Sequence, residues 1–132
     1  MILVDTSAWV EFDRATGSRT DSRLTELIAS TDLVAVTEPV IMEVLAGARD
    51  DHRQRELRRL MERFALLRFD AAIDFDAATR IYRTCRRCGV TPRGMVDCMI
   101  AAVALRHNVG LLAVDGDLDR VADVMGISME GH

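Results

Sequence analysis

Residues 95–105 restrict the possible folds of this chain more than any other segment, because the sequence MVDCMIAAVAL predicts a helix that is apolar on every side. Such a helix must be buried between other elements. Asp97 carries its only charge, and an ionised carboxylate removed from water is costly unless a cation or several hydrogen-bond donors meet it. A bound metal would satisfy Asp97, and so would an ion pair with Arg93 or a protonated, hydrogen-bonded carboxyl. The helix alone does not separate these alternatives.

Short apolar segments alternate with helical ones along the whole chain. The segments ILVD, LVAV, ALLRF and LLAV predict strands at residues 2–5, 33–36, 65–69 and 111–114. The segments between them show helical spacing or helix caps. This alternation predicts a single domain, residues 1–132, with an α/β fold. We expect a sandwich in which a mainly parallel central sheet of about four to five strands is flanked by helices.

Length and composition limit the class of protein. A chain of 132 residues, 49% of them hydrophobic, fits one core. The opening MILVDTS has neither a basic leader nor an apolar span, so we expect a cytoplasmic protein with no membrane segment. Residues 14–23 and the tail after Met125 are expected to be loosely structured. The net charge of −4 excludes coating of nucleic acid through bulk positive charge and leaves such binding to local patches.

The basic residues and the cysteines of this chain could bind phosphate or zinc, and both groups have an unusual composition. All 17 basic residues are arginine, which suits phosphate recognition, although a GC-rich genome gives the same bias and is the favoured explanation. The chain has an odd number of cysteines, Cys85, Cys88 and Cys98, which predicts free thiols in a reducing compartment. The first two have C-x-x-C spacing but close a predicted helix, and no second such pair completes a zinc cage. We therefore expect neither a disulfide scaffold nor a zinc site.

Four acidic residues fall at predicted strand ends or on the edges of predicted helices: Asp5, Glu43, Asp97 and Asp115. The carboxyl ends of parallel strands meet at one edge of a sheet, where ligands bind. Mg²⁺ and Mn²⁺ prefer oxygen ligands, keep several waters and bind through a few carboxylates plus substrate phosphate. A metal held in this way can activate water and neutralise the attacked phosphate. The four acids therefore predict hydrolysis of phosphodiester bonds.

Each acid also has a structural alternative. Asp5 could cap the helix that follows it, and Glu43 could be a solvent-facing residue at the edge of its helix. Asp115 could mark only a turn, and Asp117 could cap the next helix. Taken singly, these alternatives are favoured. Taken together with the buried Asp97, they would require four coincidences at one edge of one sheet.

Four motifs occur in the order found in PIN domains, and the chain resembles that family from end to end. They are DTS from Asp5, PVIMEVLAG around Glu43, RGMVDCMIAAVAL around Asp97 and VDGDLDRV around Asp115. The short length and the opening DTSAWVEF are most similar to VapC-type toxins of bacterial toxin–antitoxin systems. The resemblance implies a PIN-like three-layer sandwich and a Mg²⁺-dependent endoribonuclease, with Mn²⁺ as a substitute, that cuts structured RNA such as tRNA. It also implies a homodimer and a cognate VapB-type antitoxin that covers the acidic pocket.

The resemblance assigns roles to individual residues. It implies that the four acids hold metal and position the attacking water. Thr6 and Ser7 match a polar position whose hydroxyl can bind a metal-bound water or substrate. Asp117, two residues beyond Asp115, can share the metal. Leu118 stands where the family usually has an aromatic residue, so the last motif departs from the family pattern.

Arginines near these acids suggest how RNA could be held. Arg93 precedes the buried helix, whose free N–H groups would act with the guanidinium to draw an RNA phosphate towards Asp97. A simple helix entry with an exposed arginine is an equal alternative. A stripe of arginines one helical turn apart is more typical of a solvated helix face than of an RNA track; it consists of Arg80, Arg83 and Arg87.

Two other functions fit parts of the pattern. Phosphatases of the haloacid dehalogenase type also place acids at strand ends. They need a second aspartate where this chain has Ser7, and a lysine, which this chain lacks. A non-catalytic metal- or RNA-binding α/β module is the alternative to an enzyme.

Overall fold

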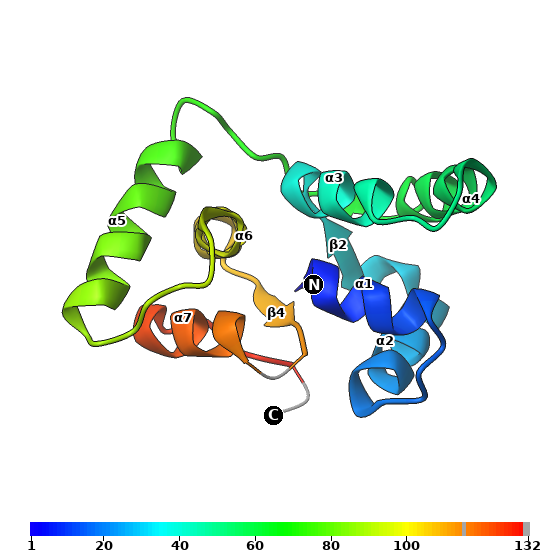
Figure 1. Cartoon of the computed structure of the whole chain (residues 1–132), viewed down its shortest axis with the longest axis horizontal. Coiled ribbons are helices and arrows are strands. Elements are labelled where there is room, and N and C mark those ends of the chain that lie inside the picture. Colours follow the sequence, from blue (N-terminus) through cyan, green and yellow to red (C-terminus); the bar gives the residue numbers. More distant parts are fainter. Residues whose placement is uncertain (115, 131–132) are drawn as a thin grey trace.

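A computed structural model describes residues 1–114 and 116–130 of the chain (Figure 1). Within these residues the sheet has four strands, all parallel, in the order β3, β2, β1 and β4. The strands are β1 (Ile2–Val4), β2 (Val34–Val36), β3 (Ala65–Leu66) and β4 (Gly110–Leu112). The predicted α/β fold with a parallel central sheet is confirmed.

Helices connect the strands, because parallel strands cannot be joined by a tight hairpin. They are α1 (Thr6–Asp13), α2 (Arg19–Ala29), η1 (a short 3-10 helix, Thr31–Leu33), α3 (Glu38–Ala46), α4 (Asp51–Met61), α5 (Asp74–Arg87), α6 (Met95–His107) and α7 (Asp117–Met125). In Figure 1, α5, α6 and α7 lie together on the left of the strands and α1 to α4 on the right. No helix of the described ranges is long and apolar enough to cross a membrane.

Helix α6 is central to the core, as its apolar sequence predicts. Residues 100–104 are buried, and the helix packs against α5, α7 and α3. On the opposite side of the sheet, Trp9 is fully buried and its ring contacts Phe12 and Phe64, with centroids 6.0 and 5.8 Å apart. Trp9 is therefore a core residue. These two layers hold the carboxyl edge of the sheet between them.

The cysteines are free thiols. Cys85 and Cys98 are buried, whereas Cys88 is exposed at the end of α5. Burial, together with the nearby Cys85 and Asp97, raises the pKa of Cys98 to about 11. A thiol with such a pKa is unreactive at neutral pH.

Strand β3 is shorter than predicted. It covers Ala65–Leu66 instead of residues 65–69. The N–H of Leu67 still donates to the Val36 carbonyl of β2 (2.8 Å), and two residues later the N–H of Phe69 donates to the Glu38 carboxylate (2.7 Å) at the start of α3.

Strand β4 also ends early, at Leu112 instead of residue 114. The N–H of Asp5 donates to the Leu112 carbonyl (2.8 Å). Two residues later, the N–H of Val114 donates to the Ser7 hydroxyl (3.1 Å). A side chain of α1 therefore replaces the strand as the partner of this segment.

Residues 14–23 are more regular than predicted. Helix α2 already begins at Arg19, and the Ser18 hydroxyl caps it by accepting the N–H of Asp21 (3.1 Å). The Asp21 carboxylate in turn accepts the N–H of Gly17 (2.9 Å). Ser18, inside the segment expected to be loosely structured, is therefore a helix cap.

Residues 126–130, in the tail after Met125, are also more regular than predicted, and residues 131–132 lie outside the described residues. Met129 forms a parallel bridge with Leu111 of β4. Glu130 accepts a hydrogen bond from Arg23 of α2, with Nε and Oε1 2.7 Å apart. The tail is therefore held by the edge of the sheet and by an ion pair that sequence spacing could not show.

Helix α3 begins at Glu38, and Thr37 occupies the N-cap position before it. The Thr37 side chain makes no capping hydrogen bond, and its buried hydroxyl has no partner among the described residues. Glu38 and Pro39 occupy the first turn, where proline is favoured because its missing N–H would lack a partner in any case.

Candidate active site

The carboxyl ends of β1 and β4 and the first turns of α1 and α6 meet at one cavity. It consists of two adjoining pockets of about 300 and 180 Å³. Both are lined by Asp5, Ser7, Arg93, Asp97 and Val114. The larger one also includes Thr6, Val10, Glu11 and Glu43, and the smaller one includes Gly116, Asp117 and Leu118. Asp5, Glu43 and Asp97 are thus brought together as predicted, while the predicted fourth acid, Asp115, lies outside the described residues.

Asp5 is both a helix cap and a lining residue of the cavity. Its Oδ2 accepts the N–H of Ser7 (3.0 Å), which caps α1, and also the Ser7 hydroxyl (2.6 Å). The residue is buried, with 6% of its surface exposed. The structural alternative for Asp5 is therefore correct, yet it does not compete with a functional role. Both bonds use one oxygen, and the side chain still lines both pockets.

Glu43 reaches the cavity from α3 and is held by α1. The Thr6 hydroxyl donates to Glu43 Oε1 at 2.6 Å. Glu43 is half-buried, so it is not a simple solvent-facing residue of its helix. Thr6 fixes the carboxylate of an acid 37 residues away in the chain.

Ser7 connects two sides of the cavity. Its hydroxyl donates to Asp5 and accepts the N–H of Val114. A hydroxyl has one proton to donate and lone pairs to accept, so both contacts can exist together. Ser7 thus joins the end of β1 to the segment that leads to residue 115.

Asp97 has the most perturbed acidity in this cavity. It lies in the first turn of α6. The N-cap residue of this helix is Gly94, which has no side chain to accept a capping hydrogen bond. Burial, followed by the negative charge of Asp5, raises its pKa to about 6, with smaller contributions from Glu43 and Asp117. Arg93 opposes the shift. A carboxylate with such a pKa is short of compensating positive charge.

Arg93 does not neutralise Asp97 by an ion pair. Its side chain is 81% exposed, and its Nε lies 3.9 Å from Oδ2 of Asp117. Asp117, the first residue of α7, is also paired with Arg120 one turn further along. Asp117 therefore lines the cavity as predicted, but with two arginines beside it.

A divalent metal would fit the chemistry of this cavity. Its polar lining consists of carboxylates, hydroxyls and one arginine, which is the oxygen-rich set that Mg²⁺ and Mn²⁺ prefer. Residues 1–114 and 116–130 contain no group of three His, Cys, Asp or Glu side chains close enough to hold a metal by themselves. An ion that keeps several waters does not need such a closed cage. The raised pKa of Asp97 points to the same missing positive charge.

Comparison with known sequences shows the family of this chain. The family model of the PIN domain matches residues 2–124. This chain belongs to the PIN-domain family. Ribonuclease VapC11 of Mycobacterium tuberculosis is 44% identical to it over 128 residues, which are 96% of each chain. The chain is accordingly a PIN domain of the VapC type.

Solved structures show the same fold as this PIN domain. One of them is VapBC2 from Rickettsia felis bound to a DNA fragment from the VapBC2 promoter. It has a TM-score of 0.74 at 18% identity, and the match covers 98% of this chain and 98% of the solved chain. VapC20 of Mycobacterium tuberculosis, described as a sarcin-ricin loop cleaving toxin, has a TM-score of 0.65 at 24% identity. It covers 90% of this chain and 93% of its own. At these identities the likeness concerns the fold.

Sequence reasoning missed several contacts of the PIN-domain cavity. The Thr6–Glu43 and Ser7–Val114 bonds depend on how α1 packs, and no local pattern indicates them. Arg120 was not singled out, although its spacing of three from Asp117 on a helix is a readable signal for an ion pair.

Proposed function

We propose that this PIN domain is a divalent-metal-dependent endoribonuclease that hydrolyses phosphodiester bonds in structured RNA, with tRNA as the first substrate class to test. One observation carries the proposal: Asp97, with a pKa raised to about 6, shares a cavity with Asp5 and Glu43 at the carboxyl edge of a parallel sheet. The ribonuclease class is also that of the relative with 44% identity. Both support the same reaction.

The acidic residues of the cavity would be the metal ligands. Asp5, Glu43 and Asp97 would hold Mg²⁺, with Mn²⁺ as a substitute, and Asp115 and Asp117 are further candidate ligands. The bound ion would lower the pKa of water and neutralise the attacked phosphate. Asp117 differs from the others, because Arg120 competes for its carboxylate.

The remaining side chains orient these groups and bind the substrate. The Thr6 and Ser7 hydroxyls hold the carboxylates of Glu43 and Asp5 at a fixed distance. Hydrogen bonds of this kind keep a ligand in its productive rotamer. Arg93, exposed at the mouth of the cavity, would contact a phosphate of the RNA, aided by the N-terminus of α6.

The test is incubation of the purified chain, free of any partner, with total tRNA and Mg²⁺ or Mn²⁺, beside a sample containing EDTA. We expect discrete fragments with metal and intact tRNA with EDTA. A folded chain that cuts no RNA with either metal would contradict the proposal and favour a non-catalytic binding module. Sequencing of the fragment ends would identify the substrate and the cleaved bond.

A cognate VapB-type antitoxin is the proposed inhibitor. The solved relative from Rickettsia felis is a VapBC assembly, which supports a protein partner for this fold. An acidic cavity open to solvent would attract a basic side chain of that partner. Co-expression with a cognate VapB-type antitoxin should yield a complex that no longer cuts RNA, and an active complex would contradict this role.

A homodimer is also proposed, through exposed apolar side chains on α3 and at the start of α5. Met42 and Phe75 are 58% and 53% exposed. Phe75 contacts Phe69, with ring centroids 4.8 Å apart, and Phe69 is bonded to Glu38, one turn before Met42. Clustered apolar exposure of this kind marks interfaces. Light scattering should give twice the chain mass, and Met42→Asp should give the monomer; a wild-type monomer would contradict the dimer.

A further inference from the structure

The charge of this chain is distributed unevenly, and the unevenness is centred on α5. Of the 17 arginines, five lie in residues 77–96, and none of the 21 acidic residues does. The whole chain has a net charge of −4, so this stretch is a basic segment in an acidic protein. It includes the second part of α5 and the loop that leads to α6.

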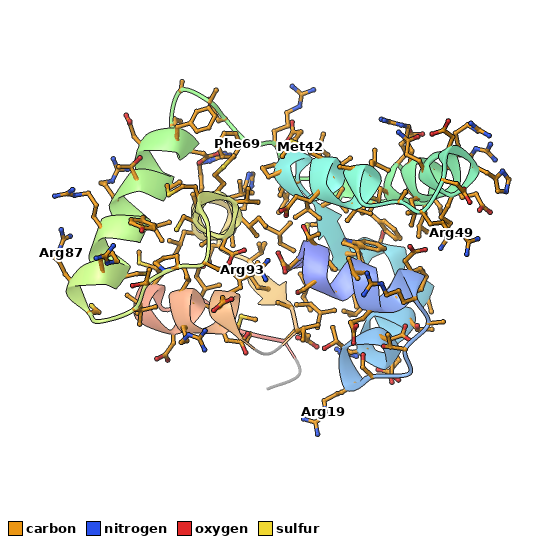
Figure 2. The ribbon with its side chains drawn as sticks, in the orientation of Figure 1. Arg19, Met42, Arg49, Phe69, Arg87 and Arg93 are labelled. Carbon is orange, nitrogen blue, oxygen red and sulfur yellow. The ribbon has the colours of Figure 1, made fainter. Side chains whose placement is uncertain are left out.

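The arginines of this segment face solvent. They are Arg80, Arg83, Arg86, Arg87 and Arg93, and all are exposed. The bonds formed by two of them go to uncharged groups, from Arg86 to the Tyr82 hydroxyl (3.4 Å) and from Arg87 to the Thr84 hydroxyl (3.2 Å). Figure 2 shows Arg87 on the outer side of α5, pointing away from α6. The charges of the four arginines on α5 are therefore available to an external anion, whereas Arg93 lies near the Asp117 carboxylate.

The segment is continuous with the acidic cavity. Its last arginine, Arg93, lines both pockets, and α5 packs across α6, whose first turn carries Asp97 (Figure 1). Residues 88–94 lead from the end of α5 to α6, and Arg93 lies at the α6 end of this connection. A strand that enters the cavity can thus pass Arg93 and continue along α5.

A polyanionic substrate needs such a surface. The acids of the cavity and the net charge of the chain both repel RNA phosphates, so binding energy must come from positive charge outside the acidic cluster. Positive charge near the cavity would also fix the direction in which the strand leaves it.

The other arginine-rich helix does not have these properties. Helices α4 and α5 each contain four arginines and two acidic residues. In α4, however, Glu56 stands among the arginines and Arg53 pairs with Asp13 (2.5 Å), whereas both acids of α5 lie in its first turn. Arg49, before α4, lies at the opposite end of the molecule from Arg87 (Figure 2). Helix α4 therefore offers a matched control with the same residue type at another place.

We propose that the arginine face of α5, made of Arg80, Arg83, Arg86 and Arg87, binds the backbone of the RNA strand on one side of the cleaved bond. This inference rests on the proposed ribonuclease function and adds the path of the substrate. Arginines at one-turn spacing present guanidinium groups in a row, which suits successive phosphates of one strand.

The experiment compares two triple variants with the same change of charge. One is Arg80→Gln/Arg83→Gln/Arg87→Gln on α5, and the other is Arg55→Gln/Arg58→Gln/Arg59→Gln on α4, where these three arginines are also exposed. A third variant replaces the α5 arginines with lysine. Binding of a labelled oligouridine of about 20 nucleotides is measured by anisotropy in EDTA between about 50 and 200 mM KCl. Circular dichroism confirms that each variant is folded.

We expect the α5 glutamine variant to bind the oligouridine at least about ten-fold more weakly. The slope of log K against log [KCl] should also become shallower by about two, because each lost phosphate contact with a single strand removes about 0.7 from the slope. The α4 variant should keep the slope, and the lysine variant should restore most of it. Equal losses in both glutamine variants would mean bulk charge only and would overturn the proposal. If the α5 glutamine variant keeps the slope and only its inhibition by the antitoxin changes, the arginine face binds an acidic protein and not RNA. That result would also overturn the proposal.

The two proposals fail differently. Normal metal-dependent cleavage of tRNA with an unchanged slope in the α5 variant would reject this surface and keep the ribonuclease. Loss of the slope in a chain that cuts no RNA would keep the surface and reject the ribonuclease. In an active enzyme, the α5 variant should raise KM for tRNA and leave kcat within about two-fold, since the lost contacts are uniform binding.

Discussion

Asp74 and Asp97 both lie in the first turn of a helix that packs in the core, yet the protein neutralises only one of them. Asp74, at the start of α5, is fully buried and accepts hydrogen bonds from Arg106 Nε (3.0 Å) and Nη2 (2.8 Å) and from the N–H of Asp70 (2.7 Å). Asp97, at the start of α6, faces Asp5 and Glu43 across a cavity.

The pKa values follow from these surroundings. Burial alone would raise the pKa of Asp74, but the bonds from Arg106 and Asp70 outweigh it and lower the pKa. Burial raises the pKa of Asp97 to about 6, and the neighbouring acids add to the shift. A paired buried carboxylate is part of the framework, whereas one left among other acids at a cavity is a candidate for function.

The largest expected effect concerns catalysis at the unpaired acid. Asp97→Asn keeps the shape of the side chain and removes its charge, so RNA cleavage should fall about 1,000-fold, equivalent to about 4 kcal/mol of transition-state stabilisation. The measurement is the single-turnover rate on tRNA. Asp123→Asn, an exposed aspartate of α7, is the control and should cleave normally. Normal cleavage by Asp97→Asn would remove Asp97 from the site.

The paired acid should give the opposite result. Arg106→Met leaves the Asp74 carboxylate buried without its partner, so the free energy of unfolding should fall by about 3 kcal/mol, while the folded fraction keeps its cleavage rate. Urea denaturation measures the loss, and Arg59→Met, on the exposed face of α4, serves as the control. A change below about 0.5 kcal/mol, the range of ordinary surface substitutions, would show that the pair is not structural.

The raised pKa of Asp97 predicts a pH dependence of stability in the metal-free protein. The folded state binds the proton more tightly than the unfolded chain, whose aspartates titrate near 3.8. Stability is therefore lost as pH rises from about 4 through 6. At pH 7, Asp97→Asn should be more stable than the wild type by about 3 kcal/mol, and at pH 4 the difference should fall below about 1 kcal/mol. Urea denaturation in EDTA at both pH values tests this, and equal stability at pH 7 would contradict it.

The smallest effect concerns the hydroxyl that holds Glu43. Thr6→Val removes the 2.6 Å hydrogen bond without changing the size of the side chain, so cleavage should slow by about five-fold, or about 1 kcal/mol. Thr6→Ser retains the hydroxyl and should retain most of the rate. If the valine and serine variants cleave equally, the bond does not position Glu43.

The sequence predicts the fold through patterns that are local. The apolar runs of β1 and β2 and the uniformly apolar α6 have one stable arrangement, a parallel sheet covered by helices. Asp5 and Asp97 could be found for the same reason, because a strand end and an apolar helix each make an acid conspicuous. Glu43 required the motif around it as well.

Contacts between distant segments could not be predicted in this way. The bond from Thr6 to Glu43 and the pair of Arg106 with Asp74 join residues more than 30 positions apart. Nothing in the local pattern separates Asp74, which is paired, from Asp97, which is not. The distinction arises only when packing brings an arginine to one acid and further acids to the other.

The most direct test of the central claim is calorimetric titration of Mn²⁺ into the metal-free wild type, Asp97→Asn and Asp123→Asn. If the acids around Asp97 form a metal site, wild type and Asp123→Asn should bind Mn²⁺ with equal affinity, and Asp97→Asn should bind at least about ten-fold more weakly. Binding of Mn²⁺ to Asp97→Asn with wild-type affinity, or no binding to the folded wild type, would contradict the assignment of this cavity as a metal-dependent active site.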